Sequence, residues 1–188
     1  MELLFATGNP SKVAAAQHIL SEYDIKVIQK DIEVPEIQAK DSEEIARFSA
    51  RYAADQLKKP VFVSDGGYYI RALKGFPGPF IRYINEWLSG DDLLRLMIGV
   101  EDRYVLIRET IAFCEPGKHP IAFTGELKAE VALELAGAGE LVDTALIHDG
   151  CKAPFAAMAE PDRSEYWKTH MLDHYHAFGQ YLKEHSRS

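Results

Sequence analysis

The sequence has few cysteines, no long hydrophobic run and a deficit of positive charge. Its 188 residues include 2 cysteines, Cys114 and Cys151, which lie far apart and without metal-ligand spacing, so the pattern predicts two free thiols in a reducing compartment. No stretch approaches the roughly 20 apolar residues that a membrane helix needs. The apolar run from Leu3 to Ala6 is too short for a signal peptide and lacks a basic flank. These absences favour a cytoplasmic protein that does not bind membranes.

Basic residues are outnumbered by acidic ones, 21 to 29, which gives a formal net charge of -8. An acidic surface repels nucleic-acid backbones, so a nucleic-acid partner is disfavoured. A net negative charge does not exclude a local basic pocket for a small anion. Because 47% of the residues are hydrophobic, the chain can bury a substantial core, and we expect residues 1–188 to form one domain with two lobes.

Short apolar runs alternate with stretches of helical period along the chain, without an internal repeat. Strands are predicted at residues 3–6, 25–29, 60–63, 104–114, 120–135 and 141–147. Helices are predicted at residues 11–23, 41–57, 80–88, 91–98 and 163–185. Asp41 and Glu44 resemble a capping box for the second helix. This order predicts an α/β fold, in which helices flank one long mixed sheet and form two lobes with a central cleft.

The turn from Thr7 to Lys12, between the first strand and the first helix, has the features of a phosphate-binding turn. Gly8 allows a tight backbone turn, and the N–H groups at the start of the helix carry partial positive charge. Thr7 and Asn9 add polar side chains, and Lys12 adds a full charge. The segment lacks the length and the Gly-Lys-Ser/Thr ending of a Walker A loop. An ordinary strand-to-helix turn with a surface lysine is the alternative.

Two acidic residues stand where a divalent cation could bind. Asp65 follows a buried strand and precedes Gly66 and Gly67, a position where α/β sheets commonly bind ligands. Glu36 lies in the polar loop of residues 33–40, stiffened by Pro35. Mg²⁺ prefers a few carboxylates together with phosphate oxygens. A turn-forming Asp-Gly pair and a solvated loop carboxylate are the simpler interpretations.

Taken together, these segments resemble one family. The ordered blocks that carry the resemblance are residues 5–12, 34–38, 41–46, 60–67 and 72–80, which read FATGNPSK, VPEIQ, DSEEIA, PVFVSDGG and ALKGFPGPF. The chain is similar to the inosine/xanthosine triphosphate pyrophosphatases, house-cleaning enzymes that remove deaminated purine nucleotides. The match is strong over residues 5–88 and weaker beyond them.

The resemblance implies both a fold and an activity. The fold would be a long curved mixed sheet with helical lobes on either side of a substrate cleft, usually in a homodimer. The activity would be Mg²⁺-dependent hydrolysis of a nucleoside triphosphate such as ITP, XTP or dITP to the monophosphate and diphosphate. Thr7, Gly8, Asn9 and Lys12 would hold the triphosphate. Glu36 and Asp65 would bind Mg²⁺, and Asp65 would also orient or deprotonate the attacking water.

The sequence departs from the family mainly where the family recognises the base. The block Glu140 to Thr144 keeps Asp143 but has Val142 in place of an aromatic residue, which would remove a stacking platform of roughly 1–3 kcal/mol. Lys168 matches the family's lysine, whereas Leu172-Asp173-His174 stands where the family has Ser-His-Arg. The resemblance therefore implies that Val142, Asp143, Lys168 and His174 contact the substrate.

Near Asp65, Ser64 replaces the usual preceding acid, and Gly66 replaces the usual Ser or Thr. We expect Gly66 to lie against the substrate, and a changed base specificity is an alternative to the purine preference of the family.

The last predicted helix also contains His170, His174 and His176. Met171 stands where a zincin-type protease requires Glu, which excludes that motif. A transition-metal site, a lining of the substrate cleft and a solvated face remain alternatives for these histidines.

Two other functions stay open beside the hydrolase. One is a nucleotide-binding protein without catalysis, because Ser64, Gly66 and the Leu172 to His174 segment all differ from the family. The other is a structural or partner-binding subunit, in which Lys12 would have no functional role. Turnover of nucleotides separates the first alternative from the enzyme, and nucleotide-dependent thermal stabilisation separates the second.

Overall fold

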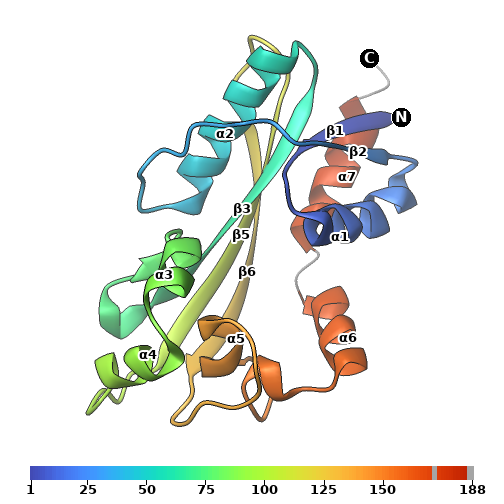
Figure 1. The fold of residues 1–188 in the computed structure, drawn as a ribbon. Helices are drawn as coiled ribbons and strands as arrows, with labels where there is room; N and C mark the ends of the chain where they lie inside the picture. Colours follow the sequence, from blue (N-terminus) through green and yellow to red (C-terminus); the bar gives the residue numbers. More distant parts are fainter. Residues whose placement is uncertain (171–172, 186–188) are drawn as a thin grey trace. The chain divides into compact units, whose positions relative to one another are not determined.

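The computed structural model describes residues 1–170 and 173–185, and it has a mixed α/β fold (Figure 1). The strands are β1 Glu2–Ala6, β2 Lys26–Lys30, β3 Val61–Ile70, β4 Pro77–Gly78, β5 Tyr104–Cys114, β6 Ile121–Val131 and β7 Leu146–His148. The helices are α1 Pro10–Leu20, α2 Ser42–Leu57, α3 Ile81–Trp87, α4 Gly90–Leu96, α5 Leu141–Ala145, α6 Glu160–His170 and α7 Asp173–His185. Among the described residues, no helix combines the length and the apolar character needed to cross a membrane.

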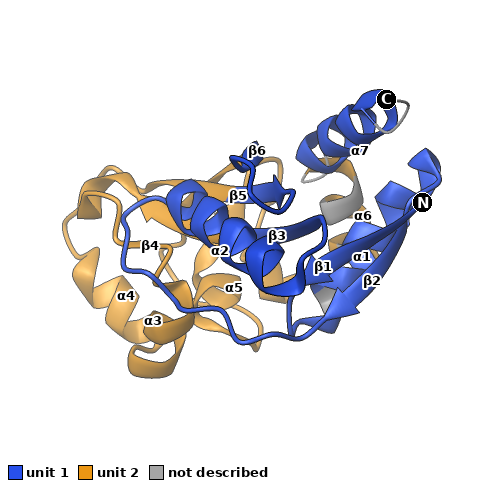
Figure 2. Ribbon diagram, turned by 90° about the horizontal axis from the view of Figure 1, so that it is seen from above, with its two compact units in different colours: residues 1–65, 109–125, 172–188 blue, residues 66–108, 126–171 orange. Residues whose placement is uncertain are grey.

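The chain divides into two compact units, each made of several chain segments (Figure 2). Unit 1 contains residues 1–65, 109–125 and 172–188, and unit 2 contains residues 66–108 and 126–171. The sheet order is β2-β1-β3-β5-β6-β7, with β4 beside β3. Strands β3, β5 and β6 therefore contribute residues to both units.

Unit 1 has a separate apolar core on each face of its strands. On one face, Phe5 stacks on Phe62 with ring centroids 4.2 Å apart, and Phe178 of α7 packs on Phe62. Residues of α1 belong to this same core. On the other face, alanines of α2 pack against Val61 and Val63 of β3. The alternation of side chains along β3 thus assigns α1 and α7 to one face and α2 to the other.

Unit 2 has one core, which includes Ile70, Leu93, Val105 and Leu146. β4 pairs antiparallel with the end of β3, and β7 pairs antiparallel with β6. Figure 1 shows α3, α4 and α5 grouped around this half of the strands.

The mixed α/β class and most predicted elements are confirmed, but three regions differ. The break predicted after Val63 is absent, because β3 continues through Gly66 and Gly67 to Ile70. Residues 141–147 form α5 followed by β7 instead of one strand. A short apolar run does not distinguish a strand from a buried helical turn, and here Thr144 N donates to Glu140 O, as in a helix. The helix predicted at 163–185 corresponds to α6 and α7, with Met171 and Leu172 outside the described residues.

The start of α2 follows the predicted capping, with one change of partner. The Asp41 side chain accepts a hydrogen bond from Glu43 N at 3.0 Å. Asp41 is thus the N-cap, and it binds the second residue of the helix. The reciprocal capping box occurs at α4 instead, between Ser89 and Asp92.

His148 should make the protein sensitive to acid. Its side chain is buried and stacks on Phe155 with ring centroids 4.6 Å apart, and burial lowers the pKa of His148 to about 4. Since the unfolded chain takes up this proton near pH 6.5, stability falls as the pH drops from about 6.5 towards 4. The loss at pH 4.5 should be about 2–3 kcal/mol from this residue.

Urea unfolding of the wild type and His148→Phe at pH 7 and pH 4.5 measures this contribution. The aromatic replacement keeps the stack and removes the proton. The variant should therefore lose less stability between the two pH values, and equal losses in both proteins would refute the assignment.

Candidate functional site

The predicted phosphate turn begins α1 and is held by its own side chains. Asn9 N donates to Thr7 Oγ1 at 3.1 Å, and Lys12 N donates to Asn9 Oδ1 at 3.3 Å. The oxygens of these two polar side chains thus accept hydrogen bonds that fix the turn. Asn9 precedes Pro10, the first residue of α1, where proline is well tolerated. Gly8 and Asn9 are exposed, so a ligand can reach the turn.

The Lys12 side chain runs from α1 to the middle of β3. Its Nζ donates to the main-chain oxygen of Ser64 at 3.0 Å, and the side chain is partly buried. Ser64 directly precedes Asp65. A full positive charge is therefore fixed beside the strand position that carries the acid predicted to bind metal.

An acidic side chain lies close to the exposed turn. If Gly8 carried a Cβ, that atom would lie 3.4 Å from Asp31 Oδ1. A negative charge this close opposes the binding of an anion, so the positive charge of Lys12 and of the α1 N-terminus matters more here than in a neutral turn.

Asp65 lies on the α2 face of the unit 1 strands, and the loop that carries Glu36 packs against the same face. Asp65 is half-buried and stands two residues after Val63, whose side chain packs on the α2 face. Glu36 is exposed, and the loop that carries it packs Ile32 and Val34 into that same core. Within the described part of the chain, no cluster of three or more His, Cys, Asp or Glu side chains could hold a metal ion. Any ion here needs ligands from a substrate or from water.

A second polar cluster, formed by Glu109, His174 and Tyr175, lies on the opposite face, beside α7. His174 Nε2 lies 3.5 Å from Glu109 Oε2, and Tyr175 OH donates to Glu109 Oε1 at 3.4 Å. Burial alone would raise the pKa of Glu109, but His174, Lys12 and Ser64 outweigh it and leave that pKa below its usual range. Burial, followed by the charge of Glu109, raises the pKa of Tyr175. Glu109 is therefore an ionised carboxylate among polar partners.

His174, predicted to contact the substrate, is fully enclosed in this cluster. Its side chain has 0% exposure, whereas that of Glu109 has 22%. Neither ring nitrogen of His174 has a well-aligned hydrogen-bond partner among the residues that the structure describes. In this arrangement His174 contacts Glu109, and Glu109 is the group that reaches solvent.

Gly125 on β6 makes room for the His174 ring. A Cβ at position 125 would collide with His174 Nδ1. Gly125→Ala should therefore lower the free energy of unfolding by about 1–3 kcal/mol, because overpacking forces neighbouring groups to move. Thermal or urea unfolding measures this change.

The matched control for Gly125→Ala places the same substitution in a His174→Ala background, where the clash is gone. There the added methyl group should be neutral or slightly stabilising, since alanine is favoured over glycine within a strand. An equal loss in both backgrounds would show that the ring does not occupy this space.

The remaining predicted residues belong to unit 2. A Cβ at Gly66 would lie 3.3 Å from the main-chain oxygen of Arg108, so this glycine allows close approach of two strands. Val142 is buried in the unit 2 core. Asp143 is half-buried, and burial followed by the charge of Glu140 raises its pKa. Lys168 lies in α6, and its side chain falls outside the described part of the chain.

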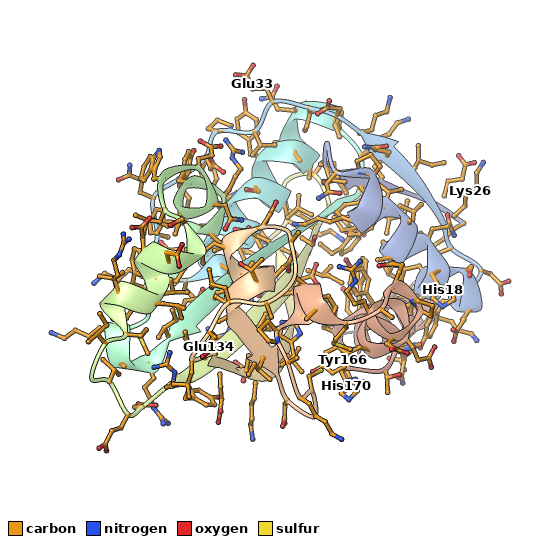
Figure 3. All side chains as sticks on the ribbon, turned by 60° about the horizontal axis from the view of Figure 1, so that its bottom comes forward. His18, Lys26, Glu33, Glu134, Tyr166 and His170 are labelled. Atoms are coloured by element: carbon orange, nitrogen blue, oxygen red, sulfur yellow. The ribbon has the colours of Figure 1, made fainter. Side chains whose placement is uncertain are left out.

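The histidines of the last two helices have separate environments. His170 stacks on Tyr166 with ring centroids 4.2 Å apart, and both are labelled in Figure 3. His176 Nδ1 lies 3.1 Å from Tyr23 OH. His174 contacts Glu109. The described contacts thus provide no shared metal site for these residues.

Sequence reasoning missed Glu109. The available signal was an acidic residue in the middle of the apolar run from Tyr104 to Cys114. Charged residues inside a strand usually lie on its solvated face, so the pattern alone did not single it out.

Comparison with known proteins gives a consistent picture. The model of the Ham1 family matches residues 3–168. The dITP/XTP pyrophosphatase of Methanopyrus kandleri is 39% identical over 164 residues, which cover 87% of each chain. That of Methanosarcina acetivorans is 41% identical over 138 residues, 73% of this chain and 75% of the relative.

Solved structures agree in fold. The Ham1 protein of Staphylococcus aureus matches with a TM-score of 0.81 at 24% identity, covering 98% of this chain and 99% of that protein. A HAM1 protein from Coxiella burnetii gives the same TM-score, identity and coverage.

Proposed function

Because the chain belongs to the Ham1 family, we propose that it hydrolyses a nucleoside triphosphate to the monophosphate and diphosphate. Relatives named dITP/XTP pyrophosphatase support this reaction class. The observation that carries the proposal is the path of Lys12, which leaves the exposed turn before α1 and donates to Ser64 O at 3.0 Å, beside Asp65. A cation, a phosphate-binding turn and an acid thereby belong to one unit.

The residues present fit Mg²⁺ as the metal. Asp65 offers hard carboxylate oxygens on the α2 face of the unit 1 strands, and Glu36 offers them from the loop that packs against this face. Mg²⁺ is usually held by one or two carboxylates together with waters and substrate phosphates, rather than by a closed protein cage. When bound, Mg²⁺ would neutralise phosphate charge and act as a Lewis acid. Asp65 and Glu36 would hold it.

The other groups position the triphosphate and neutralise its charge. The N–H groups at the start of α1 and the Lys12 ammonium attract the phosphates as the bond to the leaving diphosphate lengthens. Gly8 leaves the backbone accessible in the exposed part of the turn. Asp65 would orient the attacking water and accept its proton. Phosphoryl transfer requires mainly positioning and electrostatic stabilisation, which this small set of residues can supply.

The favoured substrates are deaminated or otherwise aberrant purine nucleotides, as the names of the relatives suggest. Val142, Asp143 and Lys168 are the proposed specificity residues, and His174, whose side chain is enclosed, would act on the substrate only through Glu109. Val142 is buried in the unit 2 core, so we expect weaker selection through base stacking than an aromatic side chain would give. We further propose that the protein is a cytoplasmic homodimer and that its two units act as one domain.

A hydrolysis screen tests the function. Purified protein is incubated with ITP, XTP, dITP and the standard ribo- and deoxyribonucleotides, and diphosphate is measured. We expect diphosphate release with Mg²⁺, a preference for inosine or xanthosine nucleotides, and no release after chelation with EDTA. Release of single phosphate instead of diphosphate would contradict the reaction class.

A nucleotide-binding protein without catalysis is the second candidate. Ser64 in place of the family's acid favours it, since a carboxylate is missing from that position. Thermal stabilisation by a nucleotide together with no diphosphate release across the panel would select this candidate.

A further inference from the structure

Glu109 occupies the same face of the unit 1 strands as Ser64. Side chains alternate along a strand, so Glu109 shares a face with Ile111 and Phe113 of β5, and Ser64 shares a face with Phe62 of β3. Ile111, Phe113 and Phe62 all belong to the core beside α1 and α7. Lys12 of α1 reaches this region from the same side. An acid is thus present on this face, and it comes from β5, whereas Asp65 of β3 lies on the opposite face.

Its contacts connect two parts of unit 1. On one side, His174 Nε2 lies 3.5 Å from Glu109 Oε2, and Tyr175 OH donates to Oε1. On the other side, Lys12 and Ser64 lie close enough to help lower the pKa of Glu109. The carboxylate therefore contacts α7, and it lies on the face of the strands from which Lys12 reaches Ser64.

The exposed fraction of each side chain determines which of these groups can contact a ligand directly. The His174 side chain has 0% exposure and Tyr175 is buried, whereas Glu109 has 22% exposure and Lys12 is half-buried. A negative charge beside a phosphate-binding lysine weakens the attraction for an anion. Such an arrangement is useful when the exact placement of the lysine matters more than the total positive charge.

We propose that Glu109 is a positioning residue whose negative charge holds the Lys12 ammonium against Ser64 in the middle of β3, with His174 as the anchor of Glu109. The inference rests on the proposed hydrolysis and adds a residue to it. Ser64 leaves its own face of β3 without an acidic side chain, and Glu109 supplies a carboxylate to that face from the neighbouring strand β5. Gly125, which makes room for the His174 ring, belongs to the same arrangement.

The first test needs no activity. In the ligand-free protein, Glu109→Gln should make Lys12 several-fold more reactive towards an amine-acylating reagent, measured residue by residue by mass spectrometry. The matched control is Glu130→Gln, an exposed glutamate on β6, which should leave Lys12 labelling unchanged. Unchanged labelling of Lys12 in Glu109→Gln, in protein that melts at the wild-type temperature, would overturn the inference.

The second test uses turnover. Glu109→Gln should lower kcat by about 10- to 100-fold, the range expected when a supporting group is removed, while KM does not rise, because a negative charge near the phosphates is lost. In a Lys12→Ala background the same substitution should have almost no further effect on kcat. If the two substitutions lowered kcat independently, so that their effects multiplied in the double variant, Glu109 would not act through Lys12.

Moving the carboxylate to a neighbouring strand distinguishes a positioning role of Glu109 from a role in folding. Glu109→Ala should lose activity, and Ser64→Asp combined with Glu109→Ala should recover part of it. No recovery in a double variant that is folded as well as the wild type would count against the proposal. If the wild type hydrolyses no nucleotide, the proposed function fails, while the Lys12 labelling result still decides the role of Glu109.

Discussion

Replacing Asp65 by Asn is expected to lower kcat for diphosphate release by about 1,000-fold, which corresponds to about 4 kcal/mol of transition-state stabilisation. The substitution keeps the size of the side chain and removes its charge. Both proposed roles of Asp65, holding Mg²⁺ and accepting a proton from water, require that charge. Asp65 is half-buried at the position where β3 leaves the unit 1 core, so the amide should be tolerated without loss of the fold.

Steady-state assays at saturating Mg²⁺ measure this effect, with thermal unfolding as the check on folding. Asp91→Asn is the matched control, because Asp91 is exposed in the first turn of α4, and its kcat should stay near the wild-type value. If Asp65→Asn retained a tenth of the wild-type rate, Asp65 could not be both the metal ligand and the base.

Lys12→Ala should lower kcat/KM by about 100-fold, or about 2.7 kcal/mol. The ammonium is fixed by Ser64 O at 3.0 Å, so it is oriented before the substrate binds. Its charge counters the triphosphate, which also experiences repulsion from Asp31 beside Gly8. Lys12→Arg keeps the charge and changes its geometry, so it should recover only part of the activity.

Lys26→Ala is the control for the loss of a positive charge. Lys26 lies at the edge of the molecule in Figure 3, with a side chain 67% exposed in an ion pair with Glu2, and such exposed pairs contribute little. An equal fall in kcat/KM in both variants would mean that Lys12 acts only through the net charge of the protein. A steeper salt dependence in wild type than in Lys12→Ala would support a direct contact with phosphate.

The parts of the fold that depend on local pattern could be predicted from the sequence. Pro10 opens α1, Asp41 caps α2, and the apolar alternation locates β5. The strand predicted at residues 141–147 was wrong for Leu141 to Ala145, because a short apolar run fits a buried helical turn as well as a short strand. The choice depended on packing against Leu93 and Ile84 of the unit 2 core.

The candidate site divides in the same way. The turn from Thr7 to Lys12 is contiguous in the chain, so its composition could reveal it. Glu109 can be recognised as a site residue only once β5 lies beside β3 and α7 contacts it. No residue spacing along the chain predicts that arrangement. The role of Gly125 is equally non-local, because the ring that it accommodates is 49 residues away, at position 174.

The path of the chain through its two units limits how this protein can be divided. β3 changes unit between residues 65 and 66, β5 between 108 and 109, and β6 between 125 and 126. A truncation that isolated either unit would cut through hydrogen-bonded strands and expose unpaired strand edges, which promote aggregation. Recombination with a relative should therefore succeed at the loops outside β3, β5 and β6, and a fragment-based screen for a minimal catalytic piece should return only insoluble products.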